Sequence, residues 1–159
     1  MHNASLTLGL IIWSVFAGAL GAGVMSLFLW GITRSGFCNV RMLVAIGSLV
    51  TRRYENAATV GGVVHAIAGM VFGIFYGYVL VSINHPGVGL NMLYGAVIGM
   101  MHGLIMALVL VAAVADEHPL PEFQQRGLSV AVAHWVGHLF YGLVVGAVIG
   151  MSGLIGAAA

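Results

Sequence analysis

The segment AATVGGVVHAIAGMVFGIFYGYVLVSI, residues 57–83, contains no Asp, Glu, Lys or Arg. A helix needs ~20 predominantly apolar residues to cross ~30 Å of hydrocarbon, so this segment is long enough to span a bilayer. Backbone groups in lipid must be hydrogen-bonded within their own segment, which favours a helix. The segment therefore predicts a transmembrane helix that carries one histidine, His65, among its apolar residues.

Three further segments have the same character: residues 6–32, 92–115 and 128–156. The whole chain is 61% hydrophobic and 6% charged, whereas about a quarter of the residues of a soluble domain are charged. We therefore expect an all-α integral membrane protein in which residues 1–159 form a single membrane domain with four transmembrane helices in the lipid bilayer. The sequence contains no long basic stripe interleaved with aromatic residues, so we expect no nucleic-acid partner.

The connections between these segments predict the orientation of the chain. The first connection contains an apolar piece, residues 42–50, that is too short to span and is flanked by arginines, which predicts an interfacial or re-entrant helix. All five basic residues are arginines of the first and third connections, and with four spans these connections lie on the same side. The positive-inside rule then places the Arg-rich connections in the cytoplasm and both termini outside.

The second and fourth spans share a pattern of one histidine followed by glycines at intervals of four residues. The pattern runs through His65, Gly69, Gly73 and Gly77 in one span and through His138, Gly142, Gly146 and Gly150 in the other. Small residues recur at the same interval in the remaining spans: Ser14, Gly18, Ala22 and Ser26 in the first, and Gly95, Gly99 and Gly103 in the third. The pattern predicts a duplicated helix hairpin whose halves are related by an axis along the membrane normal.

The glycines have two interpretations. Small residues at every fourth position, the GxxxG pattern, allow helix backbones to approach closely. Alternatively, a helix face without side chains leaves room for a flat cofactor, with Gly69, Gly73, Gly142 and Gly146 beside it.

Four histidines fall within the predicted spans: His65, His102, His134 and His138. At 1.5 Å per residue they lie about 9 to 20 Å from the inner boundary of the bilayer. An ionisable side chain in hydrocarbon is costly and usually marks a site. The spans contain no Asp or Glu, so a site there would consist of nitrogen ligands, with methionine sulfur from Met100, Met101 or Met106 near His102 as an addition.

The first function that fits these histidines is electron transfer by a membrane redox subunit with a bound cofactor. Two imidazoles on facing helices can ligate a b-type haem, and the repeat makes His65 and His138 the best axial pair. His102 and His134 are then a second pair or hydrogen-bond partners. The same four histidines could instead bind copper or zinc directly.

Two other functions remain open. One is a structural or accessory subunit without a cofactor, in a larger membrane complex or a homo-oligomer, whose histidines donate interhelical hydrogen bonds. The other is a proton or cation channel or transporter, although the spans lack Asp and Glu. No nucleophile with an adjacent base is evident, so we predict no catalytic residue and do not expect the chain to be an enzyme on its own.

Overall fold

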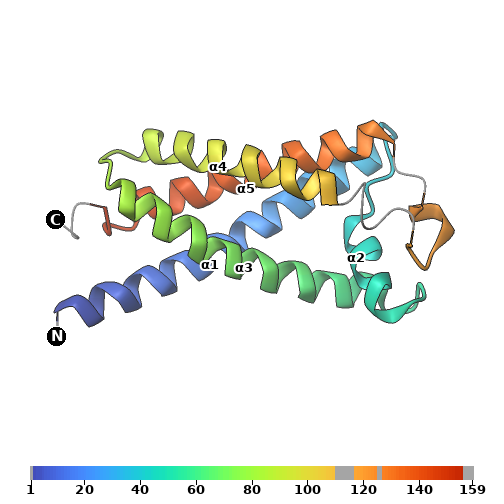
Figure 1. Cartoon of the computed structure of the whole chain (residues 1–159), viewed down its shortest axis with the longest axis horizontal. Helices are drawn as coiled ribbons and strands as arrows, with labels where there is room; N and C mark the ends of the chain where they lie inside the picture. Colours follow the sequence, from blue (N-terminus) through green and yellow to red (C-terminus); the bar gives the residue numbers. More distant parts are fainter. Residues whose placement is uncertain (1, 110–116, 125–126, 156–159) are drawn as a thin grey trace.

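The computed structural model describes residues 2–109, 117–124 and 127–155, and over these ranges it contains helices and no strands. The elements are α1 (His2–Arg34), α2 (Met42–Thr51), α3 (Ala57–Ile83), α4 (Val88–Val109), a 3-10 turn η2 (Pro121–Phe123) and α5 (Leu128–Met151). Helices α1, α3, α4 and α5 are each long and apolar enough to cross a membrane. They form the predicted four-helix bundle of a multi-pass membrane protein (Figure 1).

The observed helix bounds follow the predicted segments closely. Helix α3 begins and ends at the predicted residues, and α2 occupies the predicted short apolar piece. Helix α4 begins before the predicted start at residue 92, because the side-chain amide of Asn91 donates hydrogen bonds to the carbonyls of His85 and Gly87 and holds the turn against the helix. The predicted ends of the third and fourth spans, at residues 115 and 156, lie outside the described residues.

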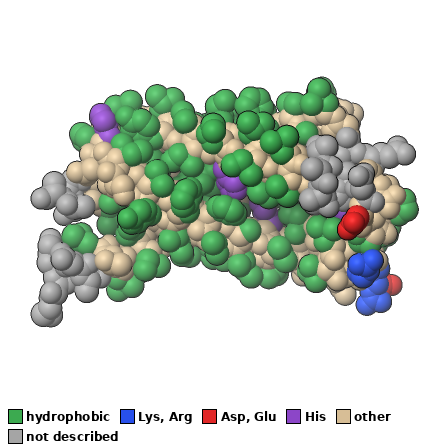
Figure 2. Space-filling model, viewed as in Figure 1, with side chains coloured by type: hydrophobic (Ala, Val, Ile, Leu, Met, Phe, Trp, Pro, Cys, Tyr) green, Lys and Arg blue, Asp and Glu red, His purple; other side chains and the backbone are tan. Residues whose placement is uncertain are grey.

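The two ends of the bundle differ in composition. Both termini and the turn between α3 and α4 lie at one end, and α2 lies at the other end with η2 (Figure 1). We call the latter the α2 end. On the face seen in Figure 2, the basic side chains gather at the α2 end. This arrangement agrees with arginine-rich connections on one side, while the compartment that this end faces stays a prediction.

Two antiparallel helix pairs, α1 with α3 and α4 with α5, pack through their glycines. A Cβ atom at Gly73 would lie 2.7 Å from the Cα of Gly18, which is closer than Cβ atoms approach their neighbours. The second pair repeats this arrangement, since a side chain at Gly142 would lie 2.7 Å from the carbonyl carbon of Gly95. Gly18 faces Gly69 and Gly73 in the first pair as Gly95 faces Gly142 and Gly146 in the second. This is the packing that a duplicated hairpin predicts.

The remaining contacts leave a space on one side of the bundle. Helix α1 packs along α5, and α2 packs on α3 where Gly47 meets Gly61. Helices α3 and α4 touch along little of their length. The space between α3 and α4 is where histidine side chains become visible in the middle of the face in Figure 2.

Candidate functional site

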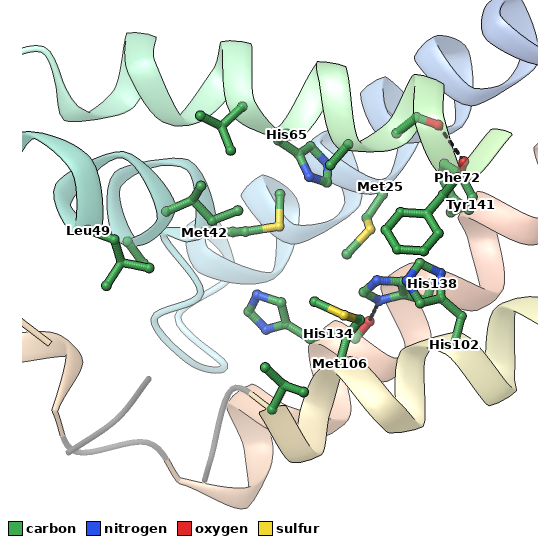
Figure 3. A pocket seen from close by; sticks show the side chains of 16 residues that line it. Met25, Met42, Leu49, His65, Phe72, His102, Met106, His134, His138 and Tyr141 are labelled. Carbon is green, nitrogen blue, oxygen red and sulfur yellow. Dashed lines mark hydrogen bonds between the residues drawn. The ribbon is translucent and has the colours of Figure 1, made fainter. Parts of the chain in front are cut away.

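A cavity of about 310 Å³ lies between α3 and α4, and residues of α1, α2 and α5 complete its wall. The structure brings all four predicted histidines to this wall: His65 from α3, His102 from α4, and His134 and His138 from α5 (Figure 3). The rest of the lining is almost entirely apolar, and none of the lining residues is Asp or Glu. The role of the four histidines as ligands stays a prediction.

His102 is held by aromatic side chains of α3 and by His138 of α5. Its ring centroid lies 4.1 Å from that of Phe72 and 4.7 Å from that of His138. Its Nδ1 lies 3.1 Å from the hydroxyl of Tyr76. The Nε2 atom of His102 is buried and has no hydrogen-bond partner among the described residues.

His134 and His138 occupy successive turns of α5 and are both buried. The Nδ1–H of His138 donates to the carbonyl of His134 at 2.8 Å, and that of His134 donates to the carbonyl of Val130 at 2.9 Å. These bonds assign the neutral tautomer that leaves the lone pair on Nε2. Metal-ligating histidines are commonly oriented in this way, with the other ring nitrogen bonded to a carbonyl.

His65 lies on the opposite side of the cavity, on α3 (Figure 3). Its Nε2 atom is buried without a hydrogen-bond partner among the described residues, as is that of His102. An unsatisfied buried polar group costs about 1–3 kcal/mol. Two residues that line one cavity therefore each carry a buried nitrogen of this kind.

The axial pairing of His65 with His138 stays a prediction, because ligands on opposite faces of a haem need not touch each other. The repeat made His65 and His138 the axial pair, whereas the ring contact seen in the described chain joins His138 to His102. All four rings nevertheless line the same cavity. Sequence equivalence between two helices does not fix distances across the bundle, because α4 inserts His102 between α3 and α5.

Only some of the predicted glycines and methionines line the cavity. Gly69 lines the cavity, whereas the space beside Gly73, Gly142 and Gly146 is filled by the backbones of neighbouring helices. A ligand in the cavity would therefore meet Gly69 alone among the four. Among the methionines near His102, all three are exposed, but Met106 lines the cavity and Met100 and Met101 do not.

Sequence reasoning missed two tyrosines beside the site. Tyr76 is fully buried and contacts His102, and Tyr141 lies with its ring centroid 5.2 Å from that of Tyr76. The tripeptide Phe-Tyr-Gly, which occurs at residues 75–77 and again at residues 140–142, was a signal that could have identified both. Met25 and Met42 also line the cavity and were not predicted.

The described residues contain no group of three or more His, Cys, Asp or Glu side chains close enough to hold a metal ion together. Imidazole nitrogens alone therefore do not complete a metal site in the described ranges. Comparisons with models of known protein families, with curated proteins and with solved structures find no match to this chain.

Proposed function

We propose that this protein holds a cofactor inside the bilayer through imidazole nitrogens of the cavity, as a subunit of a membrane redox system. The cofactor is a b-type haem or a transition metal ion. The observation that carries the proposal is the pair of buried Nε2 atoms, of His65 and His102, that have no hydrogen-bond partner among the described residues while their rings line one cavity.

The arrangement of the rings supports ligand binding better than packing. A histidine that only joins helices gains by hydrogen bonding to its neighbours, and such bonds contribute only ~0.6 kcal/mol on average in membrane proteins. The unsatisfied nitrogens of His65 and His102 add nothing to that adhesion and oppose it by their desolvation. In the tautomer that carries the proton on Nδ1, each Nε2 offers a lone pair, and a ligand that accepts it would remove this cost.

The local polarity also supports a ligand that binds neutral imidazole. The low dielectric of the bilayer disfavours the cationic form of histidine, and neutral imidazole is the form that ligates haem iron and metal ions. The backbone hydrogen bond of His138 holds its ring with Nε2 available for a further bond. We also propose that the α2 end faces the cytoplasm, in agreement with its arginines.

The test is the absorption spectrum and the metal content of the full chain purified in mild detergent after expression with haem and trace metals supplied. The proposal predicts either haem absorption in the Soret region or about one bound metal ion per chain. His65→Ala and His138→Ala should both lose it. His85→Ala is the matched control, because His85 lies in the turn between α3 and α4, outside the cavity.

A folded wild-type protein that stays colourless and free of metal would contradict the proposal and would leave the histidines a packing role. Retention of the cofactor in both cavity variants would contradict it as well. The folding of each variant is checked by its elution as a single species and by its helical circular dichroism.

A further inference from the structure

Three thioether groups point into the cavity among the imidazoles (Figure 3). They belong to Met25 of α1, Met42 of α2 and Met106 of α4, so three different helices each contribute one sulfur. Met25 and Met42 are buried. We propose that the ligand of this cavity is a soft monovalent metal ion, copper(I), bound by imidazole Nε2 atoms and methionine sulfur. This inference rests on the proposed function and specifies its ligand.

The charge of the cavity favours a monovalent ion. None of its lining residues is acidic, and the four acidic residues of the chain, Glu55, Asp116, Glu117 and Glu122, all lie outside the predicted spans. A divalent ion in this low-dielectric site would keep its full charge without a compensating anion, which is strongly unfavourable. Copper(I) with neutral ligands leaves half of that charge to be buried.

The chemistry of the donor atoms excludes hard cations. Calcium and magnesium require oxygen ligands, and the hydroxyl oxygen on the cavity wall belongs to Tyr141, which donates its proton to the carbonyl of Gly69. Thioether sulfur is a soft ligand that selects copper(I) among the common metal ions of proteins. The lining therefore offers the soft ligands that copper(I) prefers and lacks the oxygen ligands that calcium and magnesium need.

The small number of imidazole nitrogens that can share one ion also favours copper(I). No three His, Cys, Asp or Glu side chains of the described ranges are close enough to share an ion, so a tetrahedral zinc site made of histidine alone is not formed. Methionine sulfur can supply the missing ligands. Copper(I) accepts linear and trigonal coordination, so one or two imidazoles with one or two thioethers suffice. A haem with two axial imidazoles would make no use of the three sulfurs.

The experiment is a competition for copper(I) between the purified full chain and bicinchoninate, with ascorbate present and the absorbance of the chelator complex as the readout. Wild-type protein should remove about one copper(I) ion per chain from the chelator. Met42→Leu and Met106→Leu should each lower the affinity about tenfold or more, because a sulfur ligand is lost while the volume of the side chain is kept. X-ray absorption of the copper complex should show both sulfur and nitrogen neighbours.

Met101→Leu is the matched control, since Met101 lies on the same helix as Met106 but does not line the cavity. It should bind copper(I) as wild type does. The copper inference is overturned if wild type fails to compete, or if Met42→Leu and Met106→Leu bind as tightly as the control. If copper(I) does not bind but haem or zinc binds and depends on His65 and His138, the proposed function stands and the copper inference fails. If no ligand binds through the histidines, both the proposed function and the copper inference are overturned.

Discussion

The hydroxyl of Tyr141 on α5 donates a 2.7 Å hydrogen bond to the backbone carbonyl of Gly69 on α3. This bond joins the two helices that carry the repeated histidine and glycine pattern, at the wall of the cavity. Both residues are buried, so water does not compete for the bond. The hydrogen bond therefore helps to hold His65 and His138 at a fixed spacing across the cavity.

Removing this bond should destabilise the bundle slightly. We expect Tyr141→Phe to lower the free energy of unfolding by roughly 0.6–1.7 kcal/mol, from the average to the largest value found for interhelical hydrogen bonds in a membrane protein. Unfolding by a denaturing detergent, followed by circular dichroism, measures the change. Tyr78→Phe is the control, because Tyr78 is exposed on α3. Equal stability of the two variants would show that the bond contributes nothing.

The close approach of α1 and α3 depends on glycine. In Gly73→Ala the new methyl group would collide with the backbone of Gly18, and we expect a loss of about 1–3 kcal/mol in the free energy of unfolding. Gly62→Ala on the same helix is the control, because nothing lies within 4 Å of its Cβ position. That variant should be as stable as wild type or more stable. An unaffected Gly73→Ala would refute the packing account.

The fold was largely predictable because the length of each hydrophobic segment can be read from the sequence. The segment of α3, residues 57–83, was predicted at its observed bounds, because charged or polar residues lie directly before and after it. The start of α4 was not, because it depends on the side chain of Asn91 bonding back to His85 and Gly87. The hydropathy of the segment does not reveal such a bond.

The site was predictable in part. Histidines stand out in an apolar sequence, and all four line one cavity. The ring contact between His138 and His102 was not predicted, because it depends on how α4 lies between the repeated helices. Met25 and Met42 could not be singled out, since a methionine that faces a cavity has the same sequence signature as one that fills a core.

His118, in the loop before α5, connects this loop to α2 through a hydrogen bond. The Nε2–H of this buried side chain donates to the carbonyl of Ala45 at 3.1 Å, and its Nδ1 accepts the backbone N–H of Leu120 at 3.1 Å. Because Ala45 also lines the cavity, His118 helps to hold α2 in place over it.

His118→Ala should therefore expose the amide of Leu120. Loss of a hydrogen bond of about 1 kcal/mol corresponds to roughly fivefold faster hydrogen exchange at this amide, measured by mass spectrometry of peptides that cover residues 117–124. Glu117→Ala is the control, since the neighbouring Glu117 is exposed. Unchanged exchange in His118→Ala would mean that the loop is held by other contacts.

The proposed orientation predicts which ends of the bundle a membrane-impermeant maleimide can reach in intact cells. In a Cys38→Ser background the chain has no other cysteine. Pro86→Cys, in the exposed turn between α3 and α4, should be labelled from outside, whereas Ser35→Cys, exposed at the α2 end, should be labelled only after permeabilisation. The reverse pattern would place the α2 end outside.

The central claim is that imidazoles on opposite sides of the cavity bind one shared ligand. Saturation of wild type, His65→Ala, His138→Ala and the double variant with haem, and separately with copper(I), tests it most directly. The account predicts that one of these probes binds at about one per chain, that each single substitution removes most of the affinity, and that the double variant loses much less than the sum of the two. If neither probe binds to wild type, or if the two substitutions leave binding unchanged or act additively, the histidines do not share a ligand.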